Sequence, residues 1–161
     1  MPIHIRLDKE IGVLTKLERL VDEVGDLNSK LILLVGSSGK TQLLRQLATS
    51  LEGEPLDVGI VLACRLAAIP KQKRSFAVGE ELREISLRAG MGEVLLLDNL
   101  EVIFEPSLQI HPLELLKGLA HYKRVVAVWP GELRGDRLIY ADISHPEHRD
   151  YSREGVVIFE I

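Results

Sequence analysis

The 161-residue chain has the length of one domain, and its 46% hydrophobic and 27% charged residues exclude extended disorder. A formal net charge of −4 excludes the strongly basic proteins that coat nucleic acids, although a local basic patch stays open. The single cysteine, Cys64, excludes an intramolecular disulfide, and we interpret it as a small core residue. No stretch approaches the roughly 20 apolar residues of a membrane-spanning helix, so we expect a cytoplasmic protein with no membrane partner.

The chain begins with a predicted amphipathic helix. Apolar residues recur at helical spacing over residues 10–24, with lysines and glutamates between them, and the helix is expected to end near Gly25. The apolar run Leu31–Val35 predicts a buried strand. A short turn then leads to a second helix over about 40–51, which carries leucines on one face.

The middle of the chain predicts two more strands with a helix between them. The apolar run 58–63 is predicted to be a strand, and a loop and a helix over about 78–89 follow it. Gly90 and Gly92 are expected to release the chain from that helix. The next segment, 94–98, is apolar up to its final carboxylate and predicts a fully buried strand.

The last part of the chain continues the alternation. A helix is predicted from Pro112 to about residue 122, because proline favours the first helical position and leucines follow at helical spacing. A strand is predicted over 124–128 and a final one over 156–160. The polar segment 132–152 lacks periodicity, so we expect loops with at most a brief hairpin.

The main chemical motif lies in the turn between the first strand and the helix after it. Its sequence, Gly-Ser-Ser-Gly-Lys-Thr, resembles a phosphate-binding loop, in which backbone N–H groups, a lysine and a hydroxyl hold a polyphosphate and its Mg²⁺. The candidate ATP-binding residues are Gly36, Ser37, Ser38, Gly39, Lys40 and Thr41. We interpret the serines as turn residues and helix caps, and Thr41 as a Mg²⁺ ligand as well.

This loop is shorter than the usual pattern. Two residues separate Gly36 from Gly39, where the P-loop pattern has four. The shortening leaves Lys40, Thr41 and the start of the helix available but favours nucleotide-binding ancestry over full encirclement of a phosphate. A chance strand-to-helix turn is the alternative interpretation.

A carboxylate at the end of the strand 94–98 gives a second chemical signal. The run that ends in Asp98 resembles a Walker B segment, whose aspartate holds Mg²⁺. Asn99 stands where an acid usually positions the attacking water, and it cannot act as a general base. Asp98 is therefore the candidate metal ligand and catalytic residue, Glu101 is a second catalytic candidate, and we expect at most a weak ATPase.

These motifs and the alternation of strands and helices predict the fold. We expect an α/β, P-loop NTPase-like domain over residues 1–161 with an ASCE/AAA-type core. Its sheet should be mainly parallel and five-stranded, with helices on both faces and no separate lid domain. Ligands of such sheets bind beyond the carboxyl ends of the strands. The segments 36–41, 98–101 and 129–131 should therefore converge.

Several further residues are candidates for contacts with partners. Lys71, Lys73 and Arg74 could face DNA, or they could lie in a solvated loop. Trp129 could stack on a base or on a partner, or it could be a half-buried structural residue. The histidines show no regular metal-ligand spacing, so Mg²⁺ is expected to arrive with the nucleotide.

The arginines of the last segment bear on two further alternatives. Ring-forming ATPases complete each site with an arginine of the next subunit, so self-association through Arg134, Arg137, Arg149 or Arg153 stays open. A small-molecule kinase would use such arginines in a lid. The segment around Arg134 and Arg137 is too short for a covering domain.

The whole pattern is similar to the BrxF family, the small P-loop proteins of type III BREX bacteriophage-exclusion systems. The resemblance runs nearly end to end and rests on residues 31–51, 94–104, 126–131 and 140–149. Its most specific part is the Asp-Asn-Leu-Glu segment together with the later Trp-Pro-Gly.

The resemblance implies a bacterial defence protein that acts beside other BREX proteins, including an ATPase, a DNA methyltransferase and a phosphatase-like protein. By position, Lys40 and Thr41 would bind phosphate and Mg²⁺, and Asp98 would hold the metal. We expect an ATP-binding subunit, at most weakly hydrolysing, whose nucleotide state alters its contacts with partners or DNA. The alternative is a degenerate P-loop scaffold or a DNA- or protein-binding module that binds no nucleotide.

Overall fold

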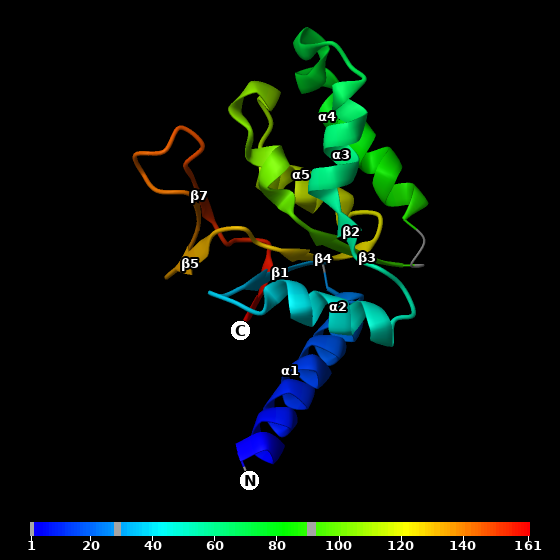
Figure 1. Ribbon diagram of the computed structural model, residues 1–161, viewed down its shortest axis with the longest axis vertical. Helices are drawn as coiled ribbons and strands as arrows, with labels where there is room; N and C mark the ends of the chain where they lie inside the picture. Colours follow the sequence, from blue (N-terminus) through cyan, green and yellow to red (C-terminus); the bar gives the residue numbers. More distant parts are fainter. Residues whose placement is uncertain (1, 28–29, 90–92) are drawn as a thin grey trace.

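A five-stranded parallel sheet forms the centre of the computed structural model, which describes residues 2–27, 30–89 and 93–161 (Figure 1). The strands are β1 (Leu31–Val35), β2 (Leu56–Asp57), β3 (Val94–Asp98), β4 (Arg124–Val128) and β8 (Val157–Glu160). Their order is β2-β3-β4-β1-β8, and each neighbouring pair is parallel. The prediction of an α/β fold on a mainly parallel five-stranded sheet is confirmed.

Helices cover both faces of this sheet, as predicted (Figure 1). On one face lie α1 (Pro2–Val24) and α2 (Lys40–Ser50). On the other lie α3 (Val58–Ala67), α4 (Lys71–Arg88), α5 (Pro112–Leu119) and two 3-10 segments, η1 (Leu100–Phe104) and η2 (Pro106–Leu108). Because both faces are covered, all five residues of β1 and of β3 are buried.

Two clusters of buried side chains join the layers. On the α1 and α2 face, Leu17 and Val21 of α1 pack with Leu44 and Leu47 of α2 against the sheet. This contact agrees with the amphipathic pattern predicted for the first helix. The opposite cluster is larger and contains two aromatic residues, Phe104 and Trp129, among mainly aliphatic side chains.

The predicted strand over 58–63 is wrong, because this segment is the first part of α3. Only Leu56–Asp57 pairs with β3, and the carboxylate of Asp57 then accepts a hydrogen bond from the N–H of Ile60 at 3.0 Å. Such a cap starts a helix, and a short apolar run alone does not tell a helix from a strand. Cys64 consequently lies on the exposed side of α3, which corrects its interpretation as a core residue.

The basic run after Pro70 is also helical, which corrects the predicted loop. α4 begins at Lys71, and Pro70 occupies the position before its first turn. Lysine, glutamine and arginine are good helix formers, so the run needs no loop. The first helix is longer than predicted, since it begins at Pro2. Gly90 and Gly92 lie outside the described residues.

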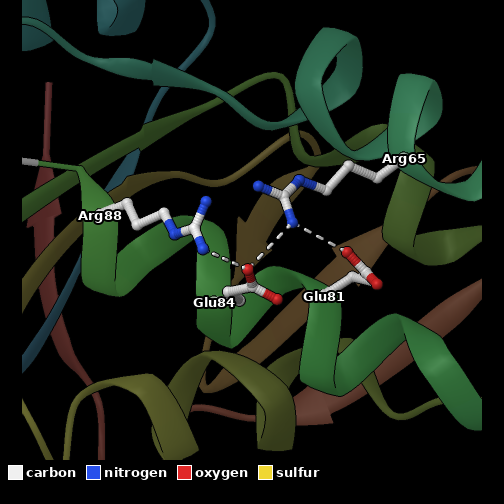
Figure 2. A network of polar contacts seen from close by, with 4 residues as sticks. All are labelled: Arg65, Glu81, Glu84 and Arg88. Atoms are coloured by element: carbon white, nitrogen blue, oxygen red, sulfur yellow. Dashed lines mark hydrogen bonds and ion pairs between the residues drawn. The ribbon is translucent and has the colours of Figure 1, made fainter.

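Ion pairs hold α3 against α4 (Figure 2). Arg65 of α3 lies 3.1 Å from Glu81 and 3.6 Å from Glu84, and Arg88 lies 2.9 Å from the same Glu84. The hydrogen bond that Arg65 donates to Glu81 is the largest cause of a raised pKa of Arg65. These two arginines therefore pair with acids of α4 and add little to a basic face.

The polar segment after β4 forms a small antiparallel sheet. Its strands are β5 (Glu132–Arg134), β6 (Arg137–Tyr140) and β7 (Arg149–Ser152), in the order β5-β6-β7. The brief hairpin expected here is present as β5 and β6, and a third strand extends it. Leu138 is fully buried and joins this sheet to the larger of the two clusters.

Candidate functional site

The glycine-containing turn between β1 and α2 has the backbone that its sequence predicts. β1 is the strand between β4 and β8, so the turn leaves the interior of the sheet at its carboxyl end. Gly36 has φ 148° and Gly39 has φ 84°, both in the region that favours glycine. A Cβ on Gly36 would also lie 3.1 Å from the carbonyl oxygen of Ile161. The turn therefore needs glycine at both ends.

The first turn of α2 directs its N–H groups toward the carboxyl ends of the strands of the parallel sheet, which together form the rim. Gly39 is the cap residue and makes no side-chain hydrogen bond, and the first turn contains no acid. Ser37 and Ser38 are exposed turn residues, so their expected role as helix caps is corrected. A helix start of this kind presents partial positive charge and N–H donors to an anion.

Lys40 lies at the first position of α2 and contacts the end of β4. Its Nζ donates a hydrogen bond to the carbonyl oxygen of Trp129 at 2.7 Å. Burial lowers the pKa of Lys40, while the charges of Glu101 and Asp98 oppose this shift. The three segments expected to converge on the rim therefore do meet, with the lysine between them.

Asp98 ends β3 as a buried carboxylate, with 8% of its surface exposed. Its Oδ1 accepts a hydrogen bond from the N–H of Asn99 at 2.8 Å. Asn99 has a left-handed backbone, with φ 54° and ψ 56°, that turns the chain sharply into η1. Glu101 is exposed in the first turn of η1, and its charge acts on Lys40 at the same rim.

A residue that the sequence did not single out completes this part of the rim. Asp57 ends β2 directly beside Asp98 in the strand register. Its Oδ2 accepts a hydrogen bond from Nδ2 of Asn99 at 2.8 Å. The sequence did contain a signal, because an aspartate just before a helical run is a usual helix start. The signal was missed because that run was interpreted as a strand.

The oxygen donors at this rim fit a Mg²⁺–nucleotide. Thr41 supplies a hydroxyl in the first turn of α2, and Asp98 supplies a carboxylate with one oxygen already hydrogen-bonded. Among the described residues, no group of three or more His, Cys, Asp and Glu side chains could hold a metal by itself. This donor set suits Mg²⁺, which usually keeps several waters and binds through one or two protein ligands plus phosphates.

Trp129 is a core residue, which corrects its candidacy as a contact for a base or a partner. Its side chain is fully buried, and its Nε1 donates a hydrogen bond to the carbonyl oxygen of Ile139 at 3.2 Å. The ring meets Phe104 edge to face, with ring centroids 5.4 Å apart. Its contribution to the rim is the backbone carbonyl that Lys40 contacts.

The basic residues that were candidates for contact with DNA lie apart from the rim. Lys71 and Lys73 are exposed in the first turn of α4, at the junction with α3 far from the sheet (Figure 1). Arg74 is half-buried, and its Nε donates to the carbonyl oxygen of Ile69 at 2.9 Å. Lys71 and Lys73 therefore remain as the exposed candidates, at the tip of the molecule where α3 meets α4.

The arginines of the small sheet have local partners. Arg137 donates to Asp150 at 2.7 Å, and Arg134 lies 2.5 Å from Glu132. Both belong to strands of the antiparallel sheet, which supplies no covering helix for a kinase-type lid. This arrangement gives the kinase alternative no support.

Comparison of the chain with protein-family models, with curated proteins and with solved structures gives no match. No helix among the described residues combines the length and the apolar character needed to cross a membrane.

Proposed function

We propose that this protein binds ATP with Mg²⁺ at the carboxyl rim of its parallel sheet. The observation that carries the proposal is the place of Lys40, which begins α2 directly after Gly39, donates to the carbonyl of Trp129 at the end of β4 and lies within electrostatic range of Asp98 and Glu101. In the proposed complex, Lys40 and the first N–H groups of α2 bind the phosphates, and Thr41 and Asp98 hold Mg²⁺.

The strand order supports assignment to the ASCE class of P-loop NTPases. In that class an additional strand separates the P-loop strand from the Walker B strand. Here β4 stands between β1, which precedes the glycine turn, and β3, which ends in Asp98. The likeness concerns strand order and motif placement together, so it is more specific than a Gly-Lys-Thr triplet.

Hydrolysis is proposed to be slow. Asn99 occupies the position of the usual acid and cannot accept a proton, and the short loop limits the contacts around the β- and γ-phosphates. We expect turnover below roughly 1 per second, the low end of ordinary kcat values. A phosphate-release assay that finds faster turnover would contradict this part of the proposal.

The cellular role is proposed from the resemblance to BrxF. On this proposal the protein is a subunit of a bacterial anti-phage system, and its nucleotide state alters its contacts with partner proteins or DNA. The rim segments after β1, β3 and β4 are the parts that a bound nucleotide would contact directly. They are therefore the elements through which such a change would begin.

Calorimetric titration of Mg²⁺–ATP into the wild type, Lys40→Ala and Lys16→Ala tests the binding proposal. Lys16 is an exposed lysine of α1, so its variant is the matched control. We expect binding in the wild type and in Lys16→Ala, and loss of binding in Lys40→Ala. Equal binding in all three would show that the nucleotide lies elsewhere.

A second candidate function is a scaffold that binds no nucleotide. Two observations favour it: the glycines of the turn are separated by only two residues, and Lys40 already has a partner in the carbonyl of Trp129. The same titration separates the candidates, because a scaffold gives no heat with ATP in any variant.

Contact with DNA is proposed for the tip where α3 meets α4. The exposed Lys71 and Lys73 carry this proposal, since salt-sensitive phosphate contacts need accessible cations. Charge reversal at both positions should weaken DNA binding and reduce its dependence on salt concentration. DNA binding that is insensitive to salt, or to these substitutions, would show that Lys71 and Lys73 do not contact DNA.

A further inference from the structure

The segment at the end of β3 lacks an acid at position 99, but the neighbouring strand supplies one. Asp57 and Asp98 are register partners on β2 and β3, so Asp57 lies at the same rim. Its Oδ2 lies 2.8 Å from Nδ2 of Asn99. An amide and a carboxylate therefore form a pair where a single acid is usual.

Hydrogen bonds to neighbouring groups hold both members of the pair. Oδ1 of Asp57 accepts from the N–H of Ile60 at 3.0 Å, which ties the carboxylate to the start of α3. The N–H of Asn99 donates to Asp98, and its left-handed backbone sets where its side chain begins. The Asn99 side chain is consequently held in place, although the residue is exposed.

The chemistry of the pair fixes the direction of the Asn99 amide. An ionised carboxylate only accepts hydrogen bonds, so the NH₂ group of Asn99 must face Asp57. The carbonyl Oδ1 of Asn99 is then left for another donor. A water molecule is a suitable donor, and an amide that orients the attacking water is an established device in nucleotide hydrolysis.

We propose that Asn99 positions the water that attacks the γ-phosphorus of ATP, and that Asp57 acts as a positioning residue that fixes the Asn99 amide. The inference rests on the proposed function and assigns catalytic help to a residue that sequence reasoning dismissed. Asn99 takes no proton. As the bond from water oxygen to phosphorus forms, the bond between the γ-phosphorus and the bridging oxygen breaks, ADP leaves, and the water proton passes to an oxygen of the released phosphate.

A purely structural role for Asp57 is the competing explanation, because the residue also caps α3. The variant Asp57→Asn separates the two, since asparagine caps helices as well as aspartate does. In this variant the new amide offers NH₂ to position 99, so the Asn99 amide must turn its own oxygen toward it. The NH₂ group of Asn99 would then face the water, and the water would lose its acceptor.

Single-turnover hydrolysis of ATP, measured beside calorimetric affinity for ATP, tests the proposal. We expect Asp57→Asn to lower hydrolysis about tenfold or more, the loss expected for a hydrogen bond to a charged group, with the affinity and the unfolding midpoint unchanged. Asn99→Gly, which suits the left-handed backbone, should lose as much. Asp26→Asn removes an exposed carboxylate between α1 and β1 and is the control, with wild-type hydrolysis expected.

The swapped double variant, Asp57→Asn with Asn99→Asp, provides a rescue. Its new carboxylate at position 99 accepts from the amide at position 57 and keeps an oxygen for the water, so hydrolysis should return at least to the wild-type rate. Unchanged or faster hydrolysis in Asp57→Asn, or no recovery in the double variant, would overturn the proposal. Wild-type protein that binds ATP without measurable hydrolysis would overturn it and leave the binding function intact. Absence of ATP binding would remove both.

Discussion

Replacement of Trp129 by alanine should be among the most destabilising single changes in this protein. The side chain is fully buried, meets Phe104 edge to face and donates its Nε1–H to the carbonyl of Ile139. Truncation of a buried tryptophan costs about 3–5 kcal/mol, because it removes apolar contacts and leaves a cavity. For a domain of this size we expect a fall in Tm of about 6–20 °C.

The variant Trp129→Phe divides this cost into its parts. Phenylalanine can keep the aromatic contact with Phe104 but loses the hydrogen bond from Nε1 to the carbonyl of Ile139, which contributes about 0.5–1.5 kcal/mol. Phe76→Ala is the control, because this aromatic side chain is 87% exposed and its removal should change stability by less than about 0.5 kcal/mol. Urea unfolding followed by circular dichroism measures all three variants without the need for a tryptophan signal.

Fluorescence gives an independent check on the same residue. Trp129 is the only tryptophan of the chain, so the emission of the wild type reports this site alone. A buried ring should resist quenching by iodide, and DNA should not protect it further. If Trp129→Ala were no more destabilising than Phe76→Ala, or if iodide quenched the wild type as it quenches free tryptophan, assignment of this ring to the core would be refuted.

Three further predictions concern the rim and the α3–α4 contact. Gly39→Ala should destabilise the fold by about 1–2 kcal/mol because alanine is strained in the left-handed backbone of this position, while a Cβ there would meet no atom within 4 Å. Urea unfolding measures the change in stability, and an unchanged midpoint would contradict the prediction. Burial lowers the pKa of Lys40 below 10.5, so the unfolded state binds more protons and wild-type stability should rise with pH toward 10.5. Lys40→Met should lack this gain when unfolding is compared at neutral and alkaline pH, and an opposite slope would contradict the sign. Arg65→Ala should destabilise the protein slightly at low salt and less at high salt, because its ion pairs are partly exposed; unfolding that is indifferent to salt would contradict this.

The strands that organise the rim could be predicted because their sequences leave little choice. β1, β3 and β4 are five-residue strands, aliphatic except for Asp98 at the end of β3 and Arg124 at the start of β4, and their observed bounds match the predicted ones. α2 begins at Lys40 as predicted. The convergence of their carboxyl ends followed from the rule that parallel sheets bind ligands there. Local pattern and topology were both sufficient at these places.

The region between Pro55 and Arg74 could not be predicted in the same way. The apolar run after Asp57 fits a strand or a helix, and the choice depends on the hydrogen bond between Asp57 and Ile60. The error hid the contact between Asp57 and Asn99, which joins residues far apart in the sequence. Periodicity carries no information about such a contact, because the register of β2 on β3 and the left-handed backbone of Asn99 together bring the two side chains into contact.

The strand order also determines when the sheet can form during folding. β1 precedes both of its neighbours, β4 and β8, and two other strands, β2 and β3, with the helices α2 to α5, come between β1 and β4 in the chain. Its apolar residues therefore have no strand partner until all of these elements have been synthesised. Parallel sheets with such distant pairings fold slowly and expose aggregation-prone segments in the meantime. The burial that makes β1 a firm base for the glycine turn thus makes it a hazard for the nascent chain.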